Sequence, residues 1–429
     1  MASPSGNGTL LKFPEGFFWG TATSTTQIEG HIQNEWTDFI ARDGSTCGIA
    51  CDSYHRYGED IEWMTRLGVN AYRMGIEWSR LQSEVGGKLN QIELARYIDQ
   101  IDRLNKADIA PMIVLHHFSN PAWINASGGW TNPQTIPAFV DYVTKLVAAL
   151  RSHVRIWNTF NEPDTYAACG FMLGEFPPLQ KWRLRAFRAV VRHMAEAHAQ
   201  VCRLIRYAGS SVGKVEVGFS KNWTYFQAHR RFSPWDSVLA LFAHSQFNRL
   251  VLRSFLQGSR KIAATYLGLN YYGRIRFHNL RPLLPTRGFS CAQLAEMGIE
   301  CDDMLERFPI GLELALARVY HECRLPIYLT EHGSSSTDEA FRERDLRENL
   351  AALHRAMDKG VDIRGFYYWS LMDNFEWQFG YTKKFGLLSV DFKNDQRPRS
   401  MKPLAEIYRR ICSDNAIPAT WEKRTLSSR

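Results

Sequence analysis

The feature of this chain that most constrains its fold is an alternation of short apolar segments with longer segments of helical periodicity. Short runs rich in β-branched and aromatic residues are typical of buried strands, and apolar residues every three or four positions are typical of helices. Eight strands are predicted, at residues 17–23, 71–78, 111–118, 154–160, 215–220, 266–272, 326–330 and 365–370. Helices are predicted between or after them, at residues 57–67, 92–106, 136–150, 184–207, 235–256, 312–323, 341–359 and 404–411.

Alternating strands and helices imply parallel strands joined by right-handed crossovers. Eight such units suit a closed barrel better than an open sheet, and 429 residues lie within the usual length of such a barrel. No Gly/Ser-rich linker divides the chain. The sequence therefore predicts a single (β/α)8 TIM barrel over residues 12–413, with a disordered N-terminal tail at 1–11 and a C-terminal tail at 414–429.

Composition excludes a disordered or fibrous chain, because 45% of the residues are hydrophobic and only 22% are charged. The formal net charge is +8, and the most basic stretch is residues 181–206. Apolar residues recur there at helical spacing, which indicates an amphipathic helix with a solvated basic face. We therefore expect no nucleic-acid partner.

The eight cysteines form no CxxC pair, no histidine cluster has zinc spacing, and no glycine loop of the phosphate-binding type is present. We expect neither a metal nor an organic cofactor. The first eleven residues lack the pattern of a secretory signal, and no apolar run is long enough to span a membrane. The expectation is a cytoplasmic protein with reduced thiols and no membrane partner.

In a barrel of this type, chemistry is carried by the loops after the strands. Sugar hydroxyls require carboxylate and amide partners, whereas the apolar face of a sugar ring lies against flat aromatic side chains. The predicted strand ends supply both kinds of group: Gln27, Arg73, His116, His117, Asn161, Glu162, Asn270, Tyr272, Glu331, Trp369, Glu376 and Trp377. Each residue alone has an ordinary structural explanation, and their joint placement at one barrel mouth favours carbohydrate chemistry.

Glu162 and Glu331 end the fourth and seventh predicted strands and can face each other across the barrel. Cleavage of a glycosidic bond uses two carboxyl groups, one to protonate the leaving oxygen and one to attack the anomeric carbon or activate water. A separation of roughly 5–5.5 Å predicts retention of configuration, and about 6.5–9.5 Å predicts inversion.

Several segments together resemble glycoside hydrolase family 1, the retaining β-glucosidases and β-galactosidases. The matching segments are FPEGFFWGTATSTTQIEG at residues 13–30, YRMGIEWSR at 72–80, TFNEP at 159–163, LGLNYY at 267–272, YLTEHG at 328–333, WSLMDNFEW at 369–377 and KFGLLSVDF at 384–392. The resemblance covers residues 12 to 411, and the order of the motifs makes it specific.

The resemblance implies that Glu331 is the nucleophile and Glu162 the general acid/base. Asn161 would bind the 2-hydroxyl of the sugar. The remaining implied roles fall into two groups: Arg73, Asn270 and Tyr272 would orient the nucleophile, and Gln27, His117, Trp369, Glu376 and Trp377 would bind the substrate. Arg73 and Tyr272 would keep Glu331 ionised.

The chain departs from the family pattern at four places. His332 stands where Asn usually follows the nucleophile, and Phe118 replaces a commoner Trp. Leu305 stands where a Trp usually forms a platform for the leaving group. The connector before the sixth strand is missing, so residues 257–265 lead almost directly into that strand.

The sequence thus predicts a retaining β-glucosidase acting on terminal non-reducing β-D-glucosides, with β-galactosides and β-fucosides as further candidates. Its expected partner is a small-molecule or oligosaccharide β-glycoside, and either a monomer or a homo-oligomer is compatible. Two alternatives stay open. One is a catalytically weakened sugar-binding relative, suggested by His332 and the missing connector. The other is a 6-phospho-β-glycosidase, disfavoured because Glu376 would repel a phosphate.

Overall fold

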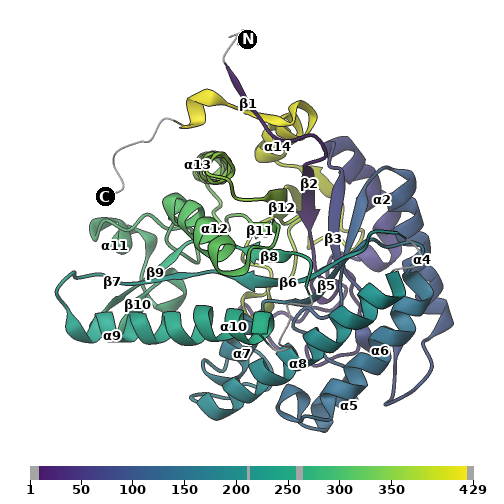
Figure 1. Ribbon diagram of the computed structural model, residues 1–429. Coiled ribbons are helices and arrows are strands. Elements are labelled where there is room, and N and C mark those ends of the chain that lie inside the picture. Colours follow the sequence, from purple (N-terminus) through teal and green to yellow (C-terminus); the bar gives the residue numbers. More distant parts are fainter. Residues whose placement is uncertain (1–8, 210–212, 258–263, 423–429) are drawn as a thin grey trace.

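Eight parallel strands close into a barrel, as predicted (Figure 1). The structure is a computed structural model and describes residues 9–209, 213–257 and 264–422. Around the barrel the strands follow chain order: β2 (Phe18–Ala22), β3 (Ala71–Gly75), β4 (Ala110–Val114), β5 (Ile156–Asn161), β6 (Glu216–Asn222), β8 (Leu267–Asn270), β11 (Ile327–His332) and β12 (Ile363–Trp369). Pairing of β12 with β2 closes the ring.

Helices surround the barrel and cover its outer face (Figure 1). Each predicted helix is present: α2 (Ser53–Leu67), α4 (Gln91–Lys106), α6 (Thr135–Leu150), α8 (Leu184–Gly209), the run α9 (Pro234–Ala243), η2 (His244–Leu250) and α10 (Val251–Gln257), then α12 (Pro309–Cys323), α13 (Glu339–Asp358) and α14 (Pro403–Asp414). The middle of the run from α9 to α10 is a π-helix. Caps fix several starts; the Asn90 side chain, for example, accepts the amides of Ile92 and Glu93 at the start of α4.

The barrel interior is filled by large aromatic side chains set against very small residues. Tyr266, Tyr328 and Tyr367 are buried there in one cluster. A Cβ atom at Gly20 would lie 2.5 Å from the Tyr367 ring, and one at Gly218 would lie 2.8 Å from the Tyr266 ring. Because the interior of an eight-stranded barrel is a packed core, each tyrosine requires a glycine opposite. This packing closes the bottom of the barrel and leaves the mouth for the site.

Shorter elements build the mouth of the barrel. A three-stranded sheet of β7 (Tyr225–Ala228), β9 (Arg274–His278) and β10 (Arg281–Leu283) projects to one side with α9 and α11 (Cys291–Glu296) (Figure 1). The other short elements are α1 (Thr25–Ile28), α3 (Trp78–Leu81), α5 (Ala122–Ala126), α7 (Pro163–Phe171), η1 (Gly129–Thr131), η3 (Pro285–Arg287), η4 (Trp377–Phe379) and the hairpin of β13 (Leu388–Val390) with β14 (Arg399–Met401).

The parts of the two predicted tails that the structure describes contain secondary structure. Strand β1 (Leu10–Lys12) pairs with β15 (Ala416–Pro418), and η5 (Ala419–Glu422) follows. Residues 10–11 and 416–422 are therefore ordered by pairing between the two ends of the chain, a non-local contact that gives no local sequence signal. Residues 1–8 and 423–429, the rest of the predicted tails, lie outside the described residues.

Candidate active site

The carboxyl ends of the barrel strands surround a cavity of about 240 Å³. Predicted site residues that line it are His117, Asn161, Glu162, Tyr272, Glu331, Trp369, Glu376 and Trp377. Gln27, Arg73 and Asn270 lie one layer behind and contact residues that line it. The structure thus brings all eleven predicted site residues together.

Glu331 is held by two donors. Its Oε1 accepts from the Arg73 guanidinium at 2.6 Å, and its Oε2 accepts from the Tyr272 hydroxyl at 2.7 Å. Burial raises the pKa of Glu331 to about 7, and the charge of Glu162 also raises it; Arg73 and Tyr272 act in the opposite direction. The expected effect of Arg73 and Tyr272 is present, but burial outweighs it.

Glu162 is held by neutral amides instead. Its Oε1 accepts from Asn270 at 2.7 Å, and its Oε2 accepts from Asn222 at 3.1 Å. Glu162 is also the N-cap residue of α7, with φ 42° and ψ 60° in the left-handed region. Non-glycine residues in that region are uncommon and cluster at functional sites. The backbone conformation sets the carboxyl group at the start of a helix, facing the cavity.

Asn161 connects Glu331 and Glu162 indirectly, through Arg73 and Asn270. Its Oδ1 accepts from Arg73 at 2.6 Å and from Asn270 at 3.0 Å, so its amide nitrogen faces His117 Nε2 at 2.9 Å. Burial holds the pKa of His117 well below its usual value, and the imidazole is therefore neutral. Because the amide can only donate, Nε2 accepts and the proton lies on Nδ1. Among the described residues Nδ1 has no partner, so it is free to donate to a substrate.

The opposite wall of the cavity combines a carboxyl group with indole rings. Gln27 donates to Glu376 Oε2 at 3.1 Å and is itself fixed by Ser24, whose hydroxyl donates to its Oε1 at 2.6 Å. Burial raises the pKa of Glu376 to about 8, and the charges of Glu331 and Glu162 add to this effect. The rings of His117 and Trp369 stack at 5.8 Å, which presents a flat apolar surface beside the polar groups.

These observations can be compared with known proteins. The family model described as Glycosyl hydrolase family 1 matches residues 10–261 and 256–417. The chain belongs to glycosyl hydrolase family 1. The two matched stretches overlap at residues 256–261, so the match breaks where the connector before the sixth strand is missing. Most of that region, residues 258–263, lies outside the described residues.

Relatives in the family match most of the length of the chain. β-Glucosidase A of Thermotoga maritima is 31% identical over 454 residues, which cover 95% of this chain and 99% of that protein. A 6-phospho-β-galactosidase of Clostridium acetobutylicum is 28% identical and covers 90% of this chain and 94% of its own. The solved β-glycosidase from Pyrococcus horikoshii superposes with a TM-score of 0.84 at 30% identity, over 98% of this chain and 100% of that one.

Leu305 and Met304 line the cavity, together with Ile275, Leu284 and Phe247. Trp182 is exposed and Trp223 is buried, and neither lines the cavity. At the position where a Trp was expected from the family pattern, the cavity is thus lined by an aliphatic side chain, Leu305.

His332 points away from the cavity. Its Nδ1 lies 2.8 Å from the Tyr271 carbonyl oxygen, and its Nε2 lies 3.3 Å from Asp345 of α13. Phe118, the other substituted position, packs against Trp377 with ring centroids 5.2 Å apart. His332 thus lies outside the cavity lining, towards α13, whereas Phe118 lines the cavity beside Trp377.

Several neighbours of the site were not predicted. Asn222, the last residue of β6, contacts Glu162, and Ser220 in the same strand contacts Arg73. Behind them, Lys221 of β6 and Asp164 of α7 form an ion pair of 2.6 Å with both side chains fully buried. The available signal for the β6 residues was their position near the end of the fifth barrel strand, the same rule that identified the other residues.

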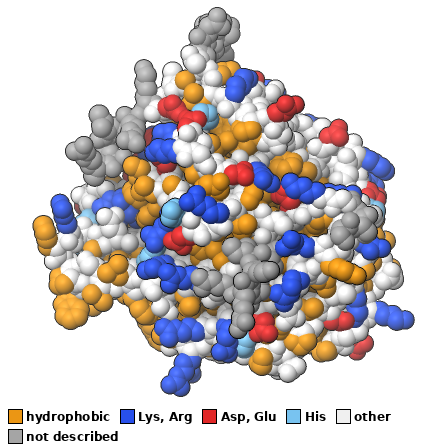
Figure 2. Space-filling model, in the orientation of Figure 1, with side chains coloured by type: hydrophobic (Ala, Val, Ile, Leu, Met, Phe, Trp, Pro, Cys, Tyr) orange, Lys and Arg blue, Asp and Glu red, His pale blue; other side chains and the backbone are white. Residues whose placement is uncertain are grey.

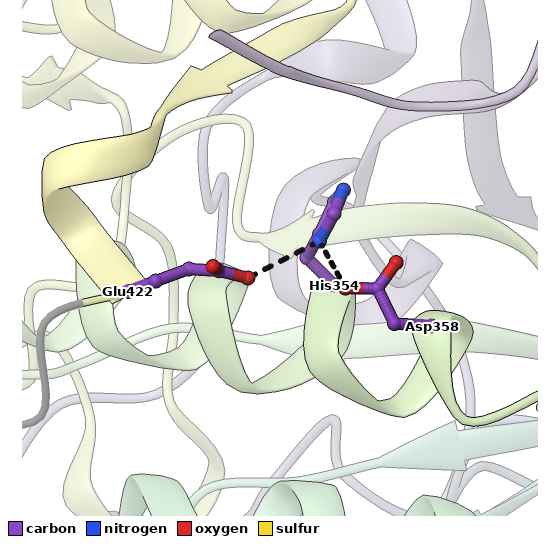
Figure 3. A group of neighbouring side chains, drawn as sticks. All are labelled: His354, Asp358 and Glu422. Atoms are coloured by element: carbon purple, nitrogen blue, oxygen red, sulfur yellow. Dashed lines mark ion pairs between the residues drawn. The ribbon is translucent and has the colours of Figure 1, made fainter. Parts of the chain in front are cut away.

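One group of described residues has the composition of a metal site but lies elsewhere. His354, Asp358 and Glu422 gather where α13 meets η5, with His354 Nδ1 3.2 Å from Asp358 and 3.4 Å from Glu422 (Figure 3). The histidine is drawn between the two carboxylates in that view. These contacts are ion pairs that fasten the C-terminal segment to α13.

Proposed function

We propose that the protein is a retaining β-glycosidase that hydrolyses terminal non-reducing β-D-glucosides. The observation that carries the proposal is the unequal environment of two carboxyl groups at one cavity: Glu331 contacts a guanidinium and a phenol, whereas Glu162 contacts two amides. A fixed cation favours the carboxylate as nucleophile, and neutral partners suit a group that gives and takes a proton.

In the first step, Glu331 attacks the anomeric carbon while Glu162 protonates the leaving oxygen, which yields a covalent glycosyl-enzyme. In the second step, Glu162 removes a proton from water, which attacks the same carbon and releases Glu331. Formation of the ester removes the charge on Glu331, and the loss of that charge lets Glu162 act as a base. Two inversions at one carbon give net retention.

The sugar would be bound by the groups around the two carboxyls. Asn161 supports a hydrogen bond to the 2-hydroxyl, and the free Nδ1–H of His117 supports a second contact. Trp369 offers a stacking surface, and Gln27 with Glu376 bind hydroxyls on the far side of the ring. Glucose, galactose and fucose share most of these contacts, so we include β-galactosides and β-fucosides in the expected range.

A second candidate is hydrolysis of 6-phospho-β-glycosides, because one relative carries that activity in its name. The buried carboxyl of Glu376 argues against it, since a phosphate placed beside Glu376 would face a like charge when that group is ionised. We therefore favour the unphosphorylated sugar.

The eight cysteines are all free thiols, which supports the proposal of a cytoplasmic location.

Stereochemistry tests the mechanism directly. Proton NMR of the sugar first released from an aryl β-glucoside should show the β-anomer before mutarotation. Initial release of the α-anomer would refute retention, and no turnover of any β-glycoside would favour the sugar-binding alternative.

Azide distinguishes the two glutamates. E162A should still turn over substrates with acidic leaving groups, and azide should accelerate it and yield a β-glycosyl azide because the intermediate on Glu331 still forms. E331A should lose turnover with every substrate. An α-glycosyl azide from E162A would mean that the two roles are exchanged.

A further inference from the structure

An exposed apolar stripe runs along the helical run from α9 to α10, outside the active-site cavity. The exposed fractions are 90% for Phe232, 71% for Trp235, 60% for Val238, 68% for Leu241 and 57% for Leu280. Phe232 lies two residues before α9, the next three lie within α9, and Leu280 lies in the turn between β9 and β10. Figure 2 shows hydrophobic side chains gathered at the left edge, over this lobe. Contiguous exposed apolar side chains indicate an interaction surface.

These side chains are held outward by a fixed framework. The Ser233 hydroxyl accepts the Asp236 amide at 3.4 Å and caps α9. The Asp236 carboxylate accepts the Leu280 amide at 2.8 Å, which ties the β9–β10 turn to the helix. Asp236 and Ala240 are buried on the inner side of α9. The stripe is therefore the outer side of an anchored helix.

Arginines surround and continue the stripe. Arg230, Arg231 and Arg281 are exposed beside its tip. Further along the same run, Arg249 and Arg253 are exposed and continue the three- to four-residue spacing of positions 235, 238, 242 and 245. They line a hollow of about 930 Å³ against α8, where Arg188, Arg192 and Arg203 stand opposite and Glu196 is the acidic side chain in the lining.

We propose that this lobe face docks on an anionic lipid bilayer. Aromatic and aliphatic side chains at the tip would enter the boundary between headgroups and acyl chains, and the arginines would contact lipid phosphates. The surface has both features of an interfacial helix, an apolar face and a basic flank. Docking of this kind is peripheral, and it is compatible with the finding that none of the described helices is long and apolar enough to cross a membrane.

Charge and side-chain chemistry favour a bilayer over the other occupants. A two-fold contact between two copies of this face would bring the arginines at its tip close to those of the partner copy, which opposes association. Single-stranded nucleic acid is bound by stacking of bases on aromatic rings. Val238, Leu241 and Leu280 have no aromatic ring but suit acyl chains.

Co-sedimentation with vesicles tests the proposal. The full chain should pellet with vesicles of equal parts phosphatidylcholine and phosphatidylglycerol, less so as salt is raised, and much less with phosphatidylcholine alone. The double variant W235Q/L241Q should partition at least roughly tenfold more weakly, because two exposed apolar side chains no longer enter the bilayer. R249E/R253E should lose the preference for anionic vesicles. The matched controls are I92Q, on α4, and R151E, at the C-cap of α6; both change exposed residues far along the chain from this face and should bind like the parent.

Circular dichroism and thermal unfolding confirm that each variant is folded, since the changed side chains are exposed. Absence of binding to the anionic vesicles at low salt would overturn the proposal. Equal binding by the parent and W235Q/L241Q would also overturn it. A dimer in sedimentation equilibrium that W235Q/L241Q dissociates, without vesicle binding, would assign the face to a second copy. Salt-matched binding to an oligothymidylate tighter than to vesicles would assign it to nucleic acid.

Discussion

The Tyr272 hydroxyl favours the ionised form of Glu331 by donating one hydrogen bond of 2.7 Å to it. That bond lowers the pKa of Glu331, which burial has raised to about 7. In Y272F the pKa should rise further, because the carboxylate loses a donor while its burial is unchanged. The nucleophile must be ionised, so the acidic limb of the kcat/KM profile should move to higher pH. A pH series with a dinitrophenyl β-glucoside measures the shift.

The neighbouring tyrosine provides the control for this prediction. The Tyr271 hydroxyl donates to the Phe308 carbonyl oxygen at 2.5 Å and does not contact Glu331. Y271F removes the same atom from the adjacent position, and its acidic limb should stay in place. An unshifted limb in Y272F would mean that the hydroxyl does not tune the nucleophile.

Leu305 offers a second test at the scale of one side chain. A Leu has less flat contact area than the indole that the family pattern suggests at this position. In L305W, aryl glucosides should bind more tightly by about 1 kcal/mol, the scale of one aromatic contact, while methyl β-glucoside changes little. Comparison of KM for the two substrates measures this difference. The same KM for both in parent and variant would show that Leu305 does not contact the leaving group.

Sequence reasoning finds the residues of the site for a physical reason. Strand ends of a parallel barrel converge, so a polar residue at the end of a strand or directly after it is placed in the site by topology alone, as Glu331 and Glu162 are. Partners such as Asn222 are found only when the strand's last residue is known to within one position. The pKa of Glu331 depends on burial, which no motif encodes.

Strand β6 and helix α7 are joined by an ion pair that bears directly on Glu162. Lys221 and Asp164 are fully buried and 2.6 Å apart, and burial raises the pKa of Asp164 to about 6. K221M should lower the free energy of unfolding by about 3–5 kcal/mol at pH 7.5, because it leaves an uncompensated buried carboxylate. Urea unfolding measures the loss, which should shrink at pH 5, where Asp164 is protonated.

The double variant separates a lost pair from a lost side chain. D164N/K221M leaves no buried charge and should regain part of the stability that K221M loses. Equal losses in K221M at pH 5 and pH 7.5 would contradict the assignment of the effect to charge. If the free energy of unfolding of D164N/K221M is lower than that of K221M by the whole loss that D164N causes alone, the two residues do not interact.

At the level of secondary-structure elements, hydrophobic periodicity in the sequence predicts those elements whose formation depends on local sequence. The barrel strands and outer helices follow from periodicity, and their observed bounds differ from the predicted ones by a few residues, as for β5. The sheet of β7, β9 and β10 was missed, because short strands with half-buried faces lack a clear period. The pairing of β1 with β15 joins residues such as Leu10 and Pro418, which lie at opposite ends of the chain, and could be found only in three dimensions.

At the scale of the whole molecule, burial changes the pKa values of several glutamates and histidines, so the folded and unfolded states bind different numbers of protons. Burial raises the pKa of Glu331 to about 7 and that of Glu376 to about 8, against 4.5 for an exposed glutamate. Buried histidines act oppositely: the pKa of His116 falls to about 4 and that of His198 to about 3. In the unfolded chain these histidines titrate at the ordinary pKa of 6.5, so they oppose the effect of the carboxyl groups near pH 6.5 and contribute little above pH 7.

Between pH 7 and 8 the folded state therefore binds more protons than the unfolded state. Stability contributed by Glu331, by Glu376 and by Glu35, whose pKa burial also raises to about 8, is complete below pH 4.5 and is lost as pH rises through 7 and 8. The free energy of unfolding should therefore fall by about 2 kcal/mol across this window. Urea unfolding at a series of pH values measures the slope. E376Q should make the slope shallower, because the amide binds no proton in either state. E406Q is the control: the pKa of Glu406 is lowered to about 2, so this group is ionised in both states across the window and its removal should leave the slope unchanged. A free energy of unfolding that is constant or rises between pH 7 and 8 would mean that these three buried carboxyl groups are ionised in the folded protein throughout.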